Sequence, residues 1–468
     1  MTDVIAMTRA GGETVLNGAT VAAFSSHLLG NLLGRGDNGY DGARRVWNGM
    51  VDKRPALIVR CARSADVVDA VRFAREHDLL MSVRGGGHNI AGKAVADGGL
   101  MIDLSTMRGV KIDPGARTAR VEGGALLGDL DREAQAFGLA TTVGVVTHTG
   151  VGGLTLGGGV GRLARKHGLA CDNLVAVDIV TADGDVVRAS RTENPELFWG
   201  VRGGGGNFGV VTSLEFQLHS LGPGVIGGIV VHSLDNARKA LEFYRDFSSA
   251  APDDLSADAA FLTSPDGDKV FAVSVCYLGS IDEGEGVLQP LRRFGPPLAD
   301  HIGPAAYTDL QAAGDALFPI GLRFYWKSHF LKEISGDMVE AAVSHFAKVP
   351  SPLSTLILQQ FGGAVGRVGR SETAFWHRDV QWDNFATSAW TASAETEIQT
   401  QWVREWWDLM KPFSMAGEYV NNLGEEGEDR VRASYGANYD RLVALKDQYD
   451  PSNVFRLNAN IPPTGLIA

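Results

Sequence analysis

Cysteine is scarce in this chain, with only three among 468 residues. Cys61, Cys171 and Cys276 lie far apart, which excludes a CxxC metal site and a disulfide framework and favours a reducing compartment. The chain also has no basic segment followed by an apolar core at its start, and no apolar run approaches the ~20 residues that span a bilayer. These absences predict a cytoplasmic protein with no metal and no membrane partner.

Positive charge is in deficit: 43 lysines and arginines face 55 aspartates and glutamates, for a formal net charge of −12. Without a basic excess the chain cannot displace counterions from a phosphate backbone, which excludes nucleic acid as its main partner. The hydrophobic content of 44% and the charged content of 21% are those of an ordinary globular protein with a sizeable core. The length predicts two or three domains at ~150 residues each.

Glycine, by contrast, is abundant, with 59 residues. The glycines gather at 85–92, 144–161 and 203–209, between segments that resemble strands and helices. Glycine is costly in an ordered segment unless the backbone needs an angle, or a closeness of approach, that a Cβ forbids. Three such clusters indicate that the backbone approaches one large ligand closely.

The first cluster is SVRGGGHNIAG, from Ser82 to Gly92, and it follows the strand-like LLMSV. A tight loop at a strand end turns several N–H groups inward and forms a nest that binds a phosphate. Arg84 would add positive charge to this nest, and His88 would meet the group that the phosphate carries. An ordinary glycine turn with a surface histidine explains this stretch, taken alone, equally well.

The remaining pattern predicts an α+β fold. A strand at 56–61, a helix capped by Ser64 and a strand at 79–83 form a predicted βαβ unit, and 174–190 reads as a hairpin turned at Asp183-Gly184. Beyond Gly222 strands alternate with amphipathic helices, which predicts an antiparallel sheet covered by helices. The predicted domains are 1–221, 222–418 and a C-terminal segment, 419–468, that returns to the first.

A nicotinamide-binding alternative comes from the second cluster. Residues 159–164, GVGRLA, satisfy GxGxxG/A, and Asp178 follows at about the spacing of an acidic ribose ligand. No clean strand precedes this motif, and its glycines continue upstream. A nicotinamide-dependent dehydrogenase is therefore the distant alternative.

Four motifs, in order, carry a resemblance to a known family: RGGGHNIAG, TGVGGLTLGGGVGRLARKHGLACDN, ELFWGVRGGGGNFGVVT and YDPSNVFRLNANI. They resemble the p-cresol methylhydroxylase/vanillyl-alcohol oxidase superfamily of flavoproteins and, within it, the berberine-bridge-enzyme-like FAD-linked oxidases, which include bacterial hydroxynicotine oxidase. The resemblance is continuous over about 54–221 and resumes near 419. It implies the two-domain fold of that superfamily, with an FAD-binding core at about 54–221.

The resemblance also implies a cofactor and its contacts. FAD would be bound covalently through His88, because a neutral imidazole is a good nucleophile towards the activated flavin ring. Attachment would raise the reduction potential of the flavin. The other implied contacts are Arg84, Gly85, Gly86, Gly87, Asn89, Gly92, Gly144, Thr147, Gly150, Gly152, Gly153 and Gly161, with Val211 at the adenine end and Asn458 and Asn460 beside the flavin ring.

The sequence departs from the family at two positions. Many members attach the flavin a second time, through a cysteine upstream of LGGG, and Val146 occupies the matching position here. A single link is therefore expected. Members with a Y-x-N-Y motif use its second tyrosine as a base, whereas YVNN in this chain begins with Tyr419 and has Asn422 at the position of the base. A neutral amine can give up hydride without a strong base, so this departure favours a C–N substrate.

The implied reaction is hydride transfer from a carbon that bears N or O to the flavin, which dioxygen reoxidises with formation of hydrogen peroxide. Gly144, near the family's oxygen path, is expected to leave that path open. Tyr419, Tyr325 and Lys327 are the candidate catalytic residues. Strand alternation allows one of Gln359 and Gln360 to face the site.

Several readings of function remain open from the sequence. They are a flavin dehydrogenase with another electron acceptor, a flavin oxidoreductase of a biosynthetic pathway, and a flavin-binding protein without activity. The expected partners are a small-molecule substrate and dioxygen, and the expected assembly is a monomer or a homodimer.

Overall fold

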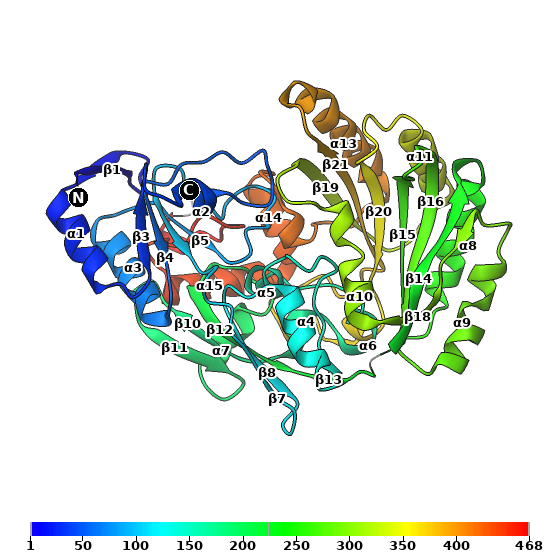
Figure 1. The fold of residues 1–468 in the computed structure, drawn as a ribbon, viewed down its shortest axis with the longest axis horizontal. Helices are drawn as coiled ribbons and strands as arrows, with labels where there is room; N and C mark the ends of the chain where they lie inside the picture. Colours follow the sequence, from blue (N-terminus) through cyan, green and yellow to red (C-terminus); the bar gives the residue numbers. More distant parts are fainter. Residues whose placement is uncertain (1, 223, 467–468) are drawn as a thin grey trace.

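The strands of the chain separate into two regions, which lie side by side in Figure 1. The computed structural model describes residues 2–222 and 224–466. Strands that precede residue 222 form several small sheets on the left of the view, and the strands that follow form one large sheet on the right. Among the described residues, every helix is too short or too polar to cross a membrane.

A four-stranded sheet holds the first glycine cluster. Its order is β3 (Asn31–Gly34), β4 (Leu57–Arg60), β6 (Leu100–Asp103) and β5 (Met81–Arg84), and β4, β6 and β5 are parallel. The predicted βαβ unit is present, with α3 (Ser64–Glu76) as its helix, but β6 lies between its two strands. Ser64 is the first helical residue rather than the N-cap, which is Arg63, so that prediction was wrong.

A five-stranded antiparallel sheet completes the N-terminal region. Its order is β11 (Val186–Ser190), β10 (Leu174–Val180), β12 (Val210–Gln217), β8 (Thr118–Glu122) and β7 (Val110–Asp113). The predicted hairpin is confirmed as β10 and β11. Helices α14 (Glu428–Tyr435) and α15 (Tyr439–Tyr449) pack Tyr435, Tyr439 and Leu442 into the core of this sheet. The C-terminal segment thus returns to the first region.

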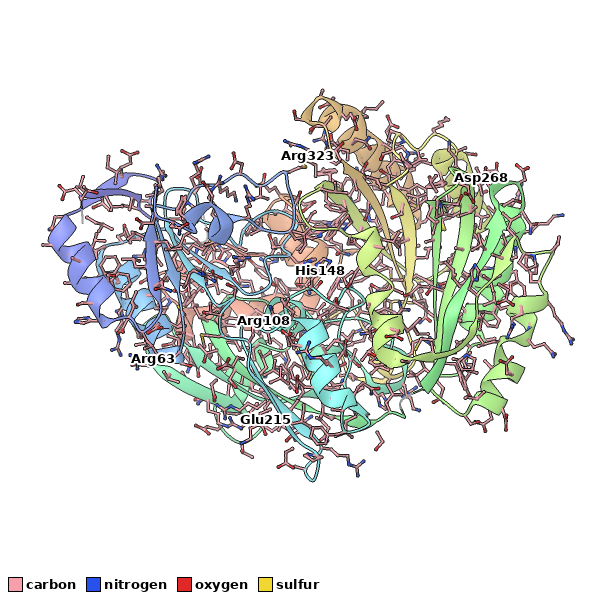
Figure 2. All side chains as sticks on the ribbon, in the orientation of Figure 1. Arg63, Arg108, His148, Glu215, Asp268 and Arg323 are labelled. Atoms are coloured by element: carbon pink, nitrogen blue, oxygen red, sulfur yellow. The ribbon has the colours of Figure 1, made fainter. Side chains whose placement is uncertain are left out.

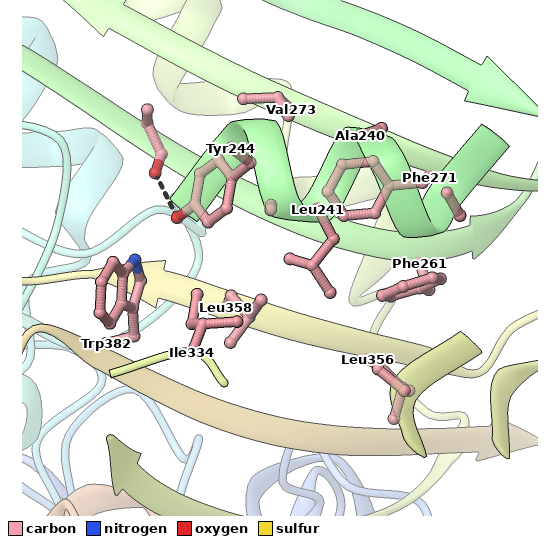
Figure 3. Close-up of a cluster of buried hydrophobic side chains, with 14 of the residues drawn as sticks. Ala240, Leu241, Tyr244, Phe261, Phe271, Val273, Ile334, Leu356, Leu358 and Trp382 are labelled. Atoms are coloured by element: carbon pink, nitrogen blue, oxygen red, sulfur yellow. Dashed lines mark hydrogen bonds between the residues drawn. The ribbon is translucent and has the colours of Figure 1, made fainter. Parts of the chain in front are cut away.

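The large sheet is antiparallel and is covered by helices on one face. Its order is β17 (Ala299–Asp300), β14 (Gly224–Ser233), β16 (Lys269–Tyr277), β15 (Leu255–Thr263), β20 (Thr355–Gln360), β21 (Trp382–Trp390) and β19 (Arg323–Leu331), with β18 (Gly303–Ala306) also paired to β14. Helices α8 (Ala237–Ser249), α9 (Ile281–Arg293), α11 (Gly336–Phe346) and α13 (Thr396–Met410) cover it. Figure 3 shows part of the resulting core, where the hydroxyl of Tyr244 donates to the carbonyl of Ala257 at 2.8 Å.

Strand alternation determines which side chains of the large sheet pack into the core beneath the helices. Ala257 and Ala259 of β15 and Leu356 and Leu358 of β20 face the helices, so the residues between them face the opposite way, toward the N-terminal region. This arrangement confirms the predicted α+β class.

The nicotinamide motif is not in the context that it needs. Helix α5 (Val151–Leu156), rather than a strand, precedes residues 159–164. Asp178 lies on β10, where it pairs with Arg120 at 2.6 Å and with Arg188 at 3.3 Å. The dinucleotide fingerprint requires a strand that leads directly into a helix, so the Rossmann alternative was wrong.

Candidate active site

Two adjoining cavities lie between the glycine loops, the large sheet and the C-terminal segment. The first has a volume of about 310 Å³ and the second about 190 Å³. Val83, Gly85, Asn89, Ala94, Gly153 and Asn421 line both cavities. The two therefore form one elongated space, which suits a ligand with two different ends.

The glycine clusters form the wall of this space. A Cβ at Gly86 would lie 2.2 Å from the backbone nitrogen of Gly150, so the two loops touch in a way that only glycine permits. A Cβ at Gly153 or Gly206 would meet no atom within 4 Å, and both residues line the second cavity. The backbone at these two positions is therefore open to a ligand, as the sequence predicted of the clusters.

His88 lines the first cavity, at the end of the loop that follows β5. Its Nε2 lies 2.7 Å from Nδ1 of His148, and the ring of Trp47 stacks on it with centroids 4.9 Å apart. Burial, and next the charge of His148, lower the pKa of His88 to about 3. The imidazole is neutral at neutral pH and is therefore able to act as a nucleophile.

The uncovered face of the large sheet forms the opposite wall. Asp258 of β15, Gln359 of β20, Phe385 of β21 and Trp326 of β19 line the first cavity there. Among the described residues, Asp258 is the only carboxylate that lines either cavity. Its Oδ1 accepts a hydrogen bond from the backbone nitrogen of Gln360 at 2.8 Å. Burial raises the pKa of this carboxyl group, and the nearby Arg162 and Arg165 oppose the rise.

The YVNN stretch forms the third side of the first cavity, to which Tyr419, Asn421 and Asn422 contribute. The hydroxyl of Tyr419 accepts hydrogen bonds from the backbone nitrogen of Gly159 and from Nδ2 of Asn421, both at 2.8 Å. Burial raises the pKa of Tyr419, so it is a neutral phenol. Nδ2 of Asn422 donates a hydrogen bond to the carboxyl group of Asp383 at 2.7 Å. Burial, together with the neighbouring Glu418, raises the pKa of Asp383 well above its usual range.

Two candidate catalytic residues lie on the wrong face of β19. Trp326 faces the cavity, so its neighbours Tyr325 and Lys327 face the covering helices. Lys327 forms an ion pair with Glu426 at 2.8 Å and lies over the ring of Trp407. Neither Tyr325 nor Lys327 lines the cavities.

The predicted cofactor residues divide into two groups. Those that line one or both cavities are Gly85, Gly86, Gly87, His88, Asn89, Gly144, Gly150, Gly152, Gly153, Val211 and Asn458. Arg84, Gly92, Thr147, Gly161 and Asn460 line neither. Asn458 lines the second cavity, together with Val211, rather than the first.

Arg84 lies beside the first glycine cluster but lines neither cavity. Its guanidinium donates to the carbonyl of Ala43 at 2.7 Å and lies 3.7 Å from the carboxylate of Asp103, and a Cβ at Gly87 would lie 3.2 Å from its Nε. Gly161 is needed for packing, because a Cβ there would lie 1.8 Å from the carbonyl oxygen of Val143.

Sequence reasoning missed several residues of the site. Trp47 and Phe318 line the first cavity, although nothing in their local pattern distinguishes them. Asp258 carried a signal, because it is the lone charged residue of a strand, LSADAAFLT, that is otherwise mostly apolar. Of the two glutamines, Gln359 faces the cavity, whereas Gln360 donates to the carbonyl of Ser248 at 2.7 Å.

The residues around the two cavities fit FAD. The open backbone at Gly153 and Gly206 allows a cofactor to approach closely. The Oδ1 atom of Asn458, which lines the second cavity, is buried and has no hydrogen-bond partner within the described chain, so it can accept from a ligand. Open glycine backbone, an unpaired amide oxygen and two connected cavities suit a protein of the α+β class that binds a large cofactor such as FAD.

Comparison with known proteins leads to the same class. An FAD binding domain matches residues 55–190, and a berberine and berberine-like domain matches residues 418–462. (R)-6-Hydroxynicotine oxidase of Paenarthrobacter nicotinovorans is 34% identical over 455 residues, which cover 94% of this chain and 98% of the relative. An FAD-linked oxidoreductase of Dictyostelium discoideum is 33% identical, over 95% of this chain and 98% of the relative.

Solved structures agree with these relatives. The crystal structure of 6-hydroxy-D-nicotine oxidase from Arthrobacter nicotinovorans matches with a TM-score of 0.86 and 33% identity, over 93% of this chain and 98% of that one. A chitooligosaccharide oxidase matches with a TM-score of 0.84 and 26% identity, over 95% of this chain and 99% of that one. The chain belongs to the berberine-bridge-enzyme-like family of FAD-linked oxidoreductases, and its cofactor is FAD.

Proposed function

We propose that this enzyme is an oxidase whose FAD is attached through His88 and which oxidises a small organic substrate at a C–N or C–O bond. The observation that carries the proposal is a neutral imidazole, held between Trp47 and His148, at the wall of a cavity that fits FAD. When bound, FAD accepts hydride from the substrate and passes two electrons to dioxygen, which becomes hydrogen peroxide.

Two observations support a single covalent link to FAD, because neither residue that could form a second link is suited to it. Val146, at the position of the second anchor in the family, lines the first cavity and has no thiol. Cys171 lines neither cavity and is fully buried, and burial raises the pKa of its thiol. A protonated, enclosed thiol is a poor nucleophile.

A C–N substrate is favoured by the wall opposite the glycine loops. Asn422 cannot accept a proton near neutral pH, and Tyr419 already accepts two hydrogen bonds. A neutral amine gives up hydride without a strong base. Asp258 supplies a carboxylate that can hold a cationic amine before it loses its proton, beside the aromatic rings of Trp326 and Phe385.

Dioxygen as acceptor and the cytoplasm as compartment are parts of the same proposal. A Cβ at Gly144 would lie 2.7 Å from Cδ1 of Leu154 and 3.0 Å from Cδ1 of Leu127, so these leucines fill the space beside the glycine, and the expected open path at Gly144 gives the proposal no support. All three cysteines are free and buried, which suits a reducing compartment.

The test has two stages. The purified protein and a His88→Ala variant are precipitated with acid, and the flavin fluorescence of each pellet is measured. Fluorescence in the wild-type pellet alone supports a single link at His88, and fluorescence in both reveals a second anchor. The protein is then assayed with a panel of secondary amines and alcohols. Peroxide formed in air supports the oxidase, whereas turnover with a dye but little peroxide supports a dehydrogenase with another acceptor.

A further inference from the structure

One cationic side chain, that of Lys93, lines the second cavity. Charged side chains such as those of Arg63 and Asp268 lie exposed at the edges of the molecule (Figure 2), whereas Lys93 is only partly exposed. Among the described residues, no other lysine or arginine lines either cavity, and Arg84 is absent from both walls. The positive charge that a ligand meets in this space is therefore that of Lys93.

The ammonium group of Lys93 has hydrogen-bond donors to spare. Its Nζ donates to the backbone carbonyl of Asn458 at 2.9 Å, the single hydrogen bond that it forms within the described chain. An ammonium group carries three N–H donors, so two remain for a ligand. Burial lowers the pKa of Lys93, and the charges of Glu426 and Glu425 oppose this. An anion that accepts from the free donors would stabilise the charged form further.

Two segments of the chain hold this group in place. Oδ1 of Asn89, which lines both cavities, accepts a hydrogen bond from the backbone nitrogen of Lys93 at 3.0 Å. In the C-terminal segment, Nδ2 of Asn458 donates to the carbonyls of Gly206 and Phe455, at 3.0 and 3.1 Å. Oδ1 of Asn458 stays buried without a partner in the described chain. The second cavity thus presents a cation and, on the residue that the cation contacts, a free hydrogen-bond acceptor.

This pair of groups fits one part of FAD. An ammonium group binds an anion, and a free amide oxygen accepts from a hydroxyl group. The oxidised flavin ring carries no charge, so the pyrophosphate is the anionic part of FAD, and the ribityl chain and the ribose beside it carry hydroxyl groups. The open backbone of Gly206 in the same cavity leaves room for this part of the cofactor.

We infer that Lys93 binds the pyrophosphate of FAD and neutralises part of its charge, the role that the sequence predicted for Arg84. Oδ1 of Asn458 accepts from a hydroxyl group next to the pyrophosphate. The inference depends on FAD as the cofactor and is independent of the covalent link at His88.

Lys53 provides a matched control. Its Nζ donates to the backbone carbonyl of Gly92 at 3.0 Å, one residue before Lys93. It is also partly exposed, and burial lowers its pKa while the charge of Glu425 opposes this. Lys53 lines neither cavity. Its removal therefore deletes a charge and a backbone contact of the same kind from the same loop, but no charge from the cavity wall.

The experiment compares FAD with its two halves. Full-length protein that carries His88→Ala, freed of flavin, is titrated at low and at high salt with FAD, with riboflavin, which lacks the pyrophosphate, and with ADP, which retains it. Lys93→Met, Lys93→Arg and Lys53→Met are each added to this parent. Flavin fluorescence measures the binding of FAD and riboflavin, and calorimetry that of ADP. Thermal unfolding of each flavin-free protein measures its stability.

We expect Lys93→Met to weaken the binding of FAD and of ADP by about tenfold to a hundredfold, the range of a hydrogen bond to a charged group. Its affinity for riboflavin should equal that of the parent, which also shows that the variant is folded. Lys93→Arg should restore most of the FAD affinity, and Lys53→Met should resemble the parent. Because salt screens an ion pair, the FAD affinity of Lys93→Met should fall less with salt than that of the parent.

The inference is overturned if Lys93→Met binds FAD as tightly as the parent does, if it loses as much affinity for riboflavin as for FAD, or if Lys53→Met weakens FAD binding equally. A parent that binds riboflavin as tightly as FAD, or that binds none of the three ligands, also overturns it. Acid precipitation of the wild type tests the link at His88 separately.

Discussion

Gly153→Ala separates cofactor binding from folding, because this glycine faces the cavities and nothing else. It lies within α5, and a Cβ at this position would meet no atom within 4 Å. The new methyl group therefore strains nothing in the chain itself. It does occupy space at the junction of the two cavities, which Gly153 lines on both sides.

We expect Gly153→Ala to stabilise the folded chain and to weaken the binding of FAD. Replacing a glycine inside a helix by alanine stabilises the folded chain by about 0.5–1 kcal/mol, since fewer unfolded conformations are lost. The unfolding temperature of the apoprotein should rise by about 0.5–1 °C, because the unfolding entropy of a chain of this length is about 1 kcal/mol/K. A methyl group between the backbone and a closely bound cofactor should weaken FAD binding at least tenfold, or about 1.4 kcal/mol.

The assay uses the His88→Ala background, in which FAD binds reversibly. Titration with FAD gives the affinity, and thermal unfolding gives the stability of the apoprotein. Gly86→Ala is the comparison, because its Cβ would lie 2.2 Å from the backbone of Gly150. It should lose both FAD binding and stability. Unchanged FAD affinity in Gly153→Ala, or a less stable apoprotein, would refute this account of the glycine wall.

Three further predictions concern buried or cavity-facing charges. Burial raises the pKa of Asp131 to about 7, so the folded chain holds this proton more tightly than the unfolded chain and loses stability as pH rises from about 4 through 7. Asp131→Asn should therefore stabilise the protein more at pH 8 than at pH 5, by about 3 kcal/mol in thermal unfolding; an equal gain at both pH values contradicts this. Asp258→Asn should weaken the binding of the cation benzyltrimethylammonium about tenfold, as measured from the flavin absorbance. The binding of neopentylbenzene, which has the same shape without the charge, should not change. Equal effects on both probes would show that Asp258 is not a cation site. Lys327→Met leaves Glu426 buried without its partner and should lower the free energy of unfolding by about 3 kcal/mol. The kcat of the folded fraction should not change. A large loss of kcat at normal stability would indicate that Lys327 acts in the active site after all.

Local sequence determined much of this protein. The glycine clusters indicated close approach to a large ligand, because glycine is costly in an ordered segment unless a Cβ there does not fit or would obstruct. Gly86 and Gly153 illustrate the two cases. Its place beside the first cluster made His88 a candidate for contact with the ligand, and His88 does line the first cavity. The α+β class followed from the change in strand and helix pattern after Gly222. Each of these inferences depends on neighbours within a few residues.

Only the tertiary structure decided which side chains meet. On β19 the sequence predicted that alternate side chains share a face, but not which face would meet the cavity. Packing between distant segments decides that, because it determines which face α13 covers. Trp326 therefore faces the cavity and Tyr325 does not. The pairing of His88 with His148 spans 60 positions and depends on two loops that touch through glycine backbone. Periodicity specifies which residues share a face, whereas the partner of that face is set by the free energy of packing the whole chain.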